Sequence, residues 1–449
     1  GAWYYGDAPF AGGDSRRERG KAQMTQEVRD VSNELYDLLN GCDRWQYNAF
    51  LLEDASAGHP LSCLGYYIID RLGLIKAYQI DERRLMSFLL QVEAGYPENP
   101  YHNRTHAASV LQTMYMLMTK AMAPGFVGNI ELLAGLISAI VHDYEHKGVN
   151  NDFLVRTGDE MAVQYNDRSP LENHHVCAAF KLMRQADCSF THNMAVEDQA
   201  MLRALMIEMV LGTDMKSHFH IIGQFQRVVE KFQGQLSPSR LSKVQSAKSE
   251  DLSIILDNES NLSMGDIDTA PATPRVLSSR TDSDGLCCPI PESSATQGGC
   301  GDPSPQSEDL DDRKLALQVA IKMADLGHVI AEPSVHVQWV YGLEEEYFRQ
   351  GDKEREFLGE VSALMDRSGG GISKSQCGFF EIVVSPLFRS FTSLFRGAKP
   401  ALRALEENME VWRQVEEENL LLDDVLNQIQ ARKGHDMAPE DVQRPPLAP

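Results

Sequence analysis

The 449-residue sequence has few basic residues relative to acidic ones. Its 42 Lys and Arg stand against 65 Asp and Glu, which gives a net charge of −23 at pH 7. This balance argues against a nucleic acid polymer as the partner, because phosphate binding along a polymer requires a basic face. It does not exclude a small anionic substrate, since a bound divalent metal can invert the local potential of an acidic protein.

The sequence also lacks a long hydrophobic run and a signal peptide. The best candidate for a membrane helix, at 130–141, is shorter than the ~18 residues that spanning requires, and it contains Glu131. It predicts a buried helix instead. We therefore expect a cytoplasmic chain without direct membrane insertion. Because the sequence begins with Gly1 rather than Met, we expect a fragment or processed chain, whose upstream sequence could hold a regulatory region or a membrane tether.

Cysteines with metal-binding or redox spacing are absent as well. The eight cysteines are Cys42, Cys63, Cys177, Cys188, Cys287, Cys288, Cys300 and Cys377. No two of them have zinc-finger or C-x-x-C spacing. This pattern predicts reduced thiols in a reducing compartment.

Alternating patterns typical of strands are scarce, whereas helical periodicity is frequent. In "VRDVSNELYDLL" the apolar residues recur at spacings of three and four, and similar stretches follow along the chain. We therefore predict an all-α fold. The expected organisation is a flexible lead-in at 1–23, a catalytic domain in two parts at 24–235 and 313–433, an insertion at 236–312 and a loose tail at 434–449.

The insertion at 236–312 differs in composition from the rest of the chain. Stretches such as "DTAPATPRVLSSRTDSDG" are rich in Ser, Pro, Thr, Gly and Asp and cannot bury a core, so we expect disorder. Its serines and threonines are candidate phosphorylation sites, although composition alone favours a plain solvated loop.

Three short stretches carry histidines and carboxylates that could bind metal. His102 and His106 lie four residues apart, His142 and Asp143 follow an apolar helix, and Asp325 ends another. Each alone has an ordinary explanation, such as polar residues at a helix start or an Asp capping the next turn. Together, two imidazoles and two carboxylates suit Zn²⁺ and a second, harder ion such as Mg²⁺ or Mn²⁺.

Two such ions could share Asp143 and a bridging hydroxide that attacks phosphorus in line. His102 would then be free to protonate the leaving oxygen. A second interpretation takes His142, Glu145 and His146 as the H-x-x-E-H motif of a zinc peptidase. It gives no role to His102, His106 or Asp325, so we favour a phosphohydrolase, although both motifs are short.

The stretches "HPLSCLGYYIIDRLGLI", "YHNRTHAASV", "HDYEHKGVNNDFL", "EMAVQYNDRSPLENHHV", "EMVLGTDMKSHF", "MADLGHV", "EEEYFRQGDKERE" and "SKSQCGFFEIVVSPLF" occur in this order. This series resembles the catalytic domain of class I 3′,5′-cyclic-nucleotide phosphodiesterases from about Cys42 to Glu418, the insertion excepted. It looks most like the calmodulin-stimulated, dual-specificity subgroup. The resemblance implies about sixteen helices around a deep pocket and hydrolysis of cAMP, cGMP or both. The resemblance is also compatible with a homodimer.

The resemblance also implies roles for single residues. Its zinc ligands match His106, His142, Asp143 and Asp325, and Asp143 also matches the bridge to Mg²⁺. His102 matches the general acid, and Glu346 matches the carboxylate that orients it. The positions around the metal waters match His146, Asn151, Glu160 and Thr213. The substrate-binding positions match Gln376, which reads the purine, Phe379, which stacks on it, and Tyr101, Met215 and His328.

His328 departs from the Asn of cAMP-selective members, so the choice between cAMP and cGMP stays open. By residue type alone, Gln376 and Phe379 would be ordinary surface and core residues. An alternative function is a catalytically weak cyclic-nucleotide-binding module, but a pure binder needs neither His102 nor two metals. No basic amphipathic helix suited to calmodulin is visible, because "SRRERGK" is too short.

Overall fold

The computed structural model describes residues 33–236, 307–369, 371–418, 420 and 425. Within these ranges the chain forms helices and no strand, so the predicted all-α fold is confirmed. Sixteen α-helices lie wholly inside the described residues, besides a helical run at 33–40. Five described cysteines are free thiols, as their spacing predicts: Cys42, Cys63, Cys177, Cys188 and Cys377.

The α-helices before the insertion are α2 (Ala49–Ala55), α3 (Pro60–Arg71), α4 (Leu74–Ala77), α5 (Glu82–Gly95), α6 (Arg104–Met116), α7 (Asn129–Val141), α8 (Asn151–Thr157), α9 (Glu160–Gln164), α10 (Pro170–Met183), α11 (Val196–Leu211) and α12 (His218–Leu236). Those after it are α14 (Ser307–Asp325), α15 (Pro333–Phe357), α16 (Gln376–Gly378), α17 (Ser385–Leu394) and α18 (Lys399–Glu418).

Short 3-10 and π-helical segments connect these helices. The 3-10 segments are η1 (Gly41–Asp43), η3 (Met215–Ser217), η4 (Gly327–Ile330), η5 (Ala363–Met365), η6 (Ile372–Ser375) and η8 (Arg396–Ala398). The π-helical segments are η2 (Leu117–Ala121) and η7 (Phe379–Val384).

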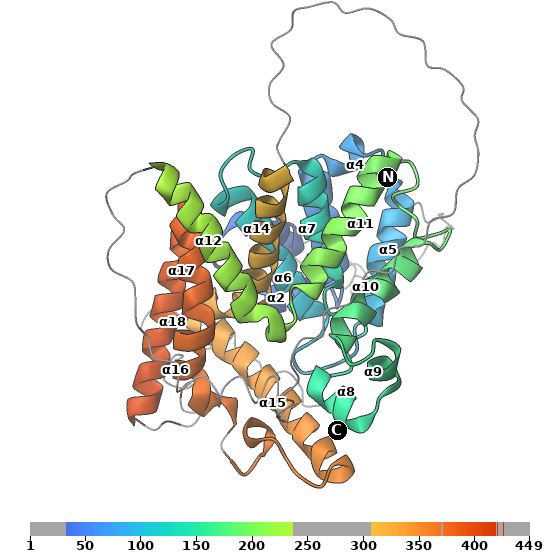
Figure 1. Ribbon diagram of the computed structural model, residues 1–449. Helices are drawn as coiled ribbons and strands as arrows, with labels where there is room; N and C mark the ends of the chain where they lie inside the picture. The colour runs from blue at the N-terminus through green and yellow to red at the C-terminus, as the bar shows by residue number, and fades with distance from the viewer. Residues whose placement is uncertain (1–32, 237–306, 370, 419, 421–424, 426–449) are drawn as a thin grey trace, which may run out of the picture.

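The core lies around α6, which packs against α3, α7 and α14, while α11 covers α7 and α14 (Figure 1). Nearly every residue of α6 and α7 is buried, as expected for α7, which is largely apolar on all sides. α6 also buries polar residues, among them Thr105, His106 and Gln112. The prediction of a buried helix at 130–141 is therefore confirmed. Because α6, α7 and α14 meet in the core, functional side chains at their ends are held on rigid elements.

Helix boundaries follow the capping residues of the sequence. The side chain of Asn103 accepts hydrogen bonds from the backbone N–H groups of Thr105 and His106, both at 3.0 Å, and so begins α6. Asp81 caps α5 in the same way. Pro60, Pro170 and Pro333 begin α3, α10 and α15, where a missing N–H costs nothing.

The helix α14 begins at Ser307, before the insertion boundary predicted at residue 312. Its first turns are polar in sequence, yet they are held to neighbouring helices by charge. Lys231 on α12 bonds Asp312 at 2.9 Å, and Arg313 lies 3.5 Å from Glu131 on α7. The lead-in at 1–23, residues 237–306 with their candidate phosphorylation sites, and the tail at 434–449 lie outside the described residues.

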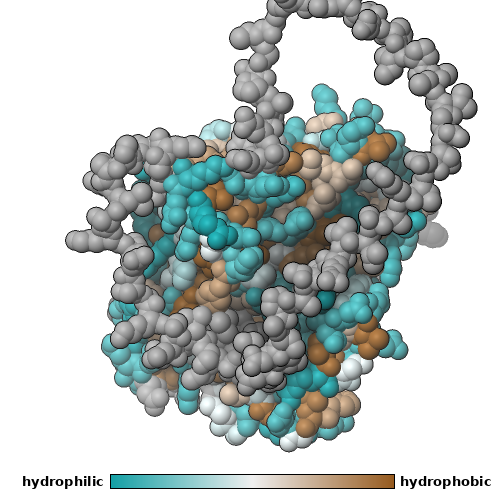
Figure 2. Space-filling model, in the orientation of Figure 1, coloured by the Kyte–Doolittle hydropathy of each residue, from teal (hydrophilic) through white to brown (hydrophobic). Residues whose placement is uncertain are grey.

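The described part of the chain contains no helix that is both long and apolar enough to cross a membrane. Hydrophilic and hydrophobic areas are interspersed on the face that Figure 2 shows.

Candidate active site

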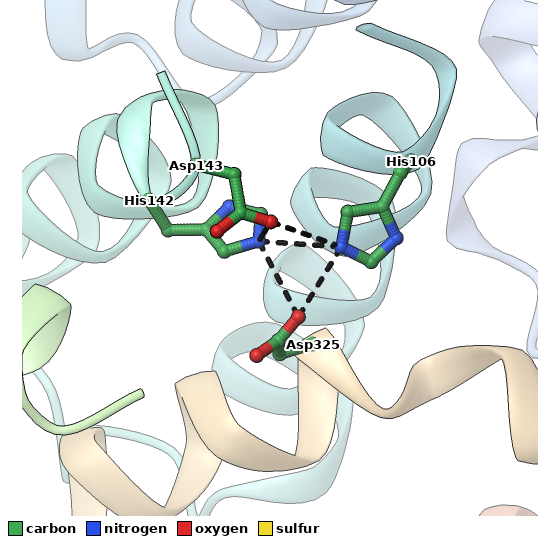
Figure 3. A group of neighbouring side chains, drawn as sticks. All are labelled: His106, His142, Asp143 and Asp325. Atoms are coloured by element: carbon green, nitrogen blue, oxygen red, sulfur yellow. Dashed lines mark hydrogen bonds and ion pairs between the residues drawn. The ribbon is translucent and has the colours of Figure 1, made fainter. Parts of the chain in front are cut away.

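Four of the predicted ligands meet at the ends of the three core helices. His106 lies in the first turn of α6, His142 and Asp143 directly follow α7, and Asp325 is the last residue of α14. Their side chains point toward one another (Figure 3). The two Nε2 atoms of His106 and His142 are 3.3 Å apart. Asp325 Oδ1 lies 3.2 Å from Nε2 of His106, and Asp143 Oδ2 lies 3.0 Å from Nε2 of His142.

The hydrogen bonds of this cluster prepare it for a cation. Nδ1 of His142 donates to the carbonyl of Ala139 at 2.9 Å, so Nε2 is the ring nitrogen that faces the two carboxylates. Oδ2 of Asp143 is buried and makes no hydrogen bond of good geometry, although it lies 3.0 Å from Nε2 of His142. Burial raises the pKa of Asp143, but His142 and His106 outweigh it and hold that pKa well below its usual range. Two imidazole nitrogens facing two ionised carboxylates fit a divalent metal ion.

His102 forms a tight pair with Glu346 of α15. His102 Nδ1 lies 2.5 Å from Glu346 Oε1, and the backbone N–H groups of Tyr101 and His102 donate to Oε2 at 3.0 Å. Burial lowers the pKa of His102, but the charge of Glu346 outweighs it and raises that pKa to about 9. Burial raises the pKa of Glu346, whereas His102 brings it down to about 2. His102 is thus an imidazolium at neutral pH, with Nε2–H available to a ligand.

Two further histidines beside the cluster are neutral. Burial and the charge of His102 lower the pKa of His146 to about 3, and its ring stacks on His102 at 4.0 Å between centroids. Its Nδ1 accepts from the N–H of Gly148 at 3.1 Å. His175 donates from Nδ1 to the carbonyl of Tyr144 at 2.6 Å, and burial lowers its pKa to about 4.

The placement of Glu145 counts against the peptidase interpretation. Glu145 has a left-handed backbone, with φ 63°, and its carboxylate bonds Nε2 of His174 at 2.7 Å. It therefore turns away from the metal cluster. His146, which that motif would need as a ligand together with His142, does not group with His142; it groups with His102 and Glu346, and with Asp143 and His175.

A cavity of about 170 Å³ opens beside the cluster. The predicted residues that line it are Tyr101, His102, Asp143, His146, Asn151, Thr213, Met215, Asp325, His328, Glu346 and Phe379. Glu172, His175, Lys216, Tyr347 and Gln350 also line it and escaped the sequence analysis. Tyr347 and Gln350 stand one and four residues after Glu346 on α15, so helical spacing from Glu346 could have suggested Gln350.

Glu160, predicted at the metal waters, lies exposed at the start of α9 and is not among the residues that line the cavity. Glu172 does line the cavity: it is buried, and Nδ2 of Asn151 donates to its two carboxylate oxygens at 3.2 and 3.0 Å. Burial and the charge of Asp214 raise the pKa of Glu172 to about 8. The sequence signal that could have identified Glu172 is its spacing of three residues from His175, because this spacing puts both residues on one face of α10.

Gln376 is buried and is not among the residues that line the cavity. It is 4% exposed, and its Nε2 donates to the carbonyl of Ile372 at 3.3 Å. Its Oε1 is buried without a hydrogen-bond partner. Phe379, three residues later and the first residue of η7, does line the cavity. His328, also in the wall, lies 3.1 Å from His336 between their Nδ1 atoms.

Comparisons with known proteins place this site in a sequence family. A sequence model of the 3′5′-cyclic nucleotide phosphodiesterase family matches residues 101–405. The probable 3′,5′-cyclic-AMP phosphodiesterase pde-4 of Caenorhabditis elegans is 30% identical over 373 residues, which cover 83% of this chain and 46% of that protein. The human dual specificity calcium/calmodulin-dependent 3′,5′-cyclic nucleotide phosphodiesterase 1B is 31% identical over 365 residues, 81% of this chain and 54% of that protein. The chain thus spans about half the length of the curated relatives it matches.

Solved structures share the fold. The phosphodiesterase domain of the RhoPDE fusion protein from the choanoflagellate Salpingoeca rosetta is 24% identical, with a TM-score of 0.64. The match covers 84% of this chain and 96% of that one.

Proposed function

Because the chain belongs to the 3′,5′-cyclic nucleotide phosphodiesterase family, we propose that it hydrolyses cAMP, cGMP or both to 5′-nucleoside monophosphates. The observation that carries the proposal is the meeting of two groups at one cavity. Asp143 and Asp325 of the metal cluster and the His102–Glu346 pair all line it. A ligand in this cavity would touch a metal ion and an acid together.

The metal cluster has the donors that such a reaction needs. We propose Zn²⁺ at His106, His142, Asp143 and Asp325, and Mg²⁺ or Mn²⁺ in a second site that shares Asp143. When bound, a pair of divalent ions activates water and neutralises the charge that develops on the phosphoryl oxygens. Oδ2 of Asp143, which is buried and makes no hydrogen bond of good geometry, supports this assignment.

His102 supplies the proton for the leaving group. Water adds to phosphorus and releases one proton while the P–O3′ bond breaks, and Nε2 of His102 gives its proton to O3′, which leaves as a hydroxyl. The proton released by the water balances the one that His102 gives up, so the imidazolium is restored over the whole reaction. Glu346 holds Nδ1 at 2.5 Å and fixes the direction of Nε2. His146, neutral and stacked on His102, adds no competing charge.

The remaining wall residues fit a purine nucleotide. Phe379 offers an aromatic face for the base, and Tyr101, Met215 and His328 complete the wall. His328 in place of Asn, and relatives described as dual specificity, support activity on both cAMP and cGMP. We also retain a cytoplasmic location and a possible homodimer as proposals of the same kind.

The decisive experiment measures turnover of cAMP and cGMP side by side by the purified chain, with Zn²⁺ and Mg²⁺ and after chelation. We expect 5′-AMP and 5′-GMP to form only with metal. Tight binding of either nucleotide without product would support the weak binding module instead. Casein cleavage abolished by Glu145→Gln would support the peptidase, and we expect none.

A further inference from the structure

Helix α15 presents three consecutive carboxylates to three different partners. Successive residues of a helix point about 100° apart, so neighbours in sequence face different surroundings. Glu346 holds His102, as described above. Glu345 pairs with Arg367, whose Nη1 lies 2.8 Å from its Oε2. Glu344 faces the turn that leads into Gln376. The proposed function gives Glu344 no role.

Glu344 accepts hydrogen bonds from that turn. Its Oε2 accepts from the backbone N–H of Ser373 at 3.1 Å. Burial raises the pKa of Glu344, while hydrogen bonds from Ser373 and from the backbone of Ile372 act in the opposite direction. The carboxylate thus satisfies the first N–H groups of η6 as a capping residue would, although it comes from another helix.

Gly371 leaves room for this contact. A Cβ atom at Gly371 would overlap the carboxylate of Glu344. The backbone of Gly371 has φ 67° and ψ −168°, a conformation that is essentially restricted to glycine. Two independent features of one residue, its conformation and its missing side chain, therefore allow the carboxylate to reach the turn.

The turn continues directly into the segment that carries Gln376 and then Phe379, the residue proposed to meet the base. η6 (Ile372–Ser375) is followed without a gap by Gln376, whose Nε2 donates to the carbonyl of Ile372. α16 then passes into the π-helix η7, and Phe379 at its start lines the cavity. π-helical turns are rare and occur frequently at functional sites. A shift of the turn would move both Gln376 and Phe379.

We propose that Glu344 is a positioning residue that fastens the turn 371–375 to α15 and thereby sets the place of Phe379 beside the base of the substrate. This inference rests on the proposed function, because it assumes that a purine lies against Phe379. Glu344 touches neither the substrate nor the metal cluster, so its effect should fall on base binding and spare the chemistry.

The test compares ligands with and without a base. In Glu344→Ala we expect KM for cAMP and cGMP to rise about tenfold with kcat within about twofold, the pattern of lost uniform binding. Equilibrium binding of 5′-AMP should weaken by a similar factor, whereas binding of ribose 5-phosphate should not change. Glu344→Gln should stay close to the unmodified chain, because its amide oxygen can still accept from Ser373. Glu356→Ala, at an exposed position of the same helix, is the control.

Gly371→Ala gives an independent check, since its methyl group would displace the same carboxylate. We expect at least the same loss of 5′-AMP affinity, because alanine also strains a backbone conformation restricted to glycine. The double variant should be no weaker than Gly371→Ala alone, because the contact is already broken there. Unchanged 5′-AMP binding in Glu344→Ala would overturn the inference. Equal losses for 5′-AMP and ribose 5-phosphate would also overturn it, because they would show a general structural role.

The binding measurements separate this inference from the proposed function. A chain that binds 5′-AMP in a Glu344-dependent way but turns over neither cyclic nucleotide would contradict the hydrolase alone. A chain that hydrolyses cAMP or cGMP and is indifferent to Glu344→Ala would contradict the inference alone.

Discussion

Asp143 is the residue on which the metal cluster depends most. It is partly buried, and its Oδ2, which lies 3.0 Å from Nε2 of His142, makes no hydrogen bond of good geometry. We expect Asp143→Asn to lose at least about 100-fold in kcat and to reduce bound metal, because loss of a ligand should exceed the effect of losing an outer partner. Metal content per chain and turnover of cAMP measure this. Full turnover at saturating metal in Asp143→Asn or Asp325→Ala would contradict the mechanism. The matched control is Asp70→Asn, which makes the same change at an exposed position.

The pKa of His102 determines the pH at which kcat should fall on the basic side of the pH profile. Glu346 raises the pKa of His102 to about 9, so the acid is protonated below that pH and its contribution is lost as the pH rises through it. In Glu346→Gln burial remains without the opposing charge, so the pKa of His102 should fall. We expect the basic limb of kcat to move to lower pH and kcat at pH 8 to drop. In the control variant Glu356→Gln the basic limb should stay in place. If it also stays in place in Glu346→Gln, His102 is not the titrating acid.

Sequence and structure agree best for residues that follow apolar helices. His142, Asp143 and Asp325 could be predicted because a charge at the end of a buried helix needs a partner. Glu160 and Glu172 could not be told apart in this way, since both lie in the first turn of a helix and only tertiary packing buries Glu172. The positions of Gln376 and Glu344 also depend on contacts between segments distant in sequence.

At the scale of elements, the cap of α6 links helix stability to the metal site. The side chain of Asn103 accepts from the N–H of His106 itself, so it fixes the first turn that carries this ligand. We expect Asn103→Ala to lower the free energy of unfolding by about 1 kcal/mol and also to weaken metal binding. Asp81→Ala removes an equivalent cap from α5, which carries no ligand, and should lower stability only. Thermal unfolding and a metal titration measure both effects, and equal metal affinities in the two variants would refute the link.

The helices themselves could be predicted from periodicity, but their ends could not always be. α14 begins before the apolar pattern does, because Asp312 and Arg313 form ion pairs with α12 and α7. Such pairs between segments leave no periodic signal in the sequence.

At the scale of the whole molecule, the fold should not depend on residues 237–306. Lys231 and Asp312 lie five residues from the adjoining ends of α12 and α14 and are in contact, and both ends lie at the top of Figure 1. A linker of about ten residues should therefore be long enough to join the two ends. The shorter loop should reduce the entropic free-energy cost of loop closure by about 2 kcal/mol. We expect an equal or higher Tm and an unchanged kcat. A loss of Tm or of cAMP turnover would show that the segment contributes to the fold or the site.

The family resemblance read from the sequence is confirmed, since the family model covers residues 101–405 and relatives described as calcium/calmodulin-dependent are among the matches. The family could be identified from the sequence because its motifs occur in a fixed order, and an insertion between two motifs does not change that order. How the chain chooses between cAMP and cGMP did not follow from the motifs, because it depends on where His328 and Gln376 lie in the folded wall.

The division of the metal cluster between α7 and α14 has a consequence for how the protein is made. Three ligands emerge from the ribosome early, whereas Asp325 follows only after the long segment at 237–306. At usual rates of translation this interval is on the order of ten seconds. During it the nascent chain carries two histidines and one carboxylate without their last partner, so firm capture of the ion must wait for the second half. A message cut short within the insertion would therefore yield a chain that cannot complete its metal site.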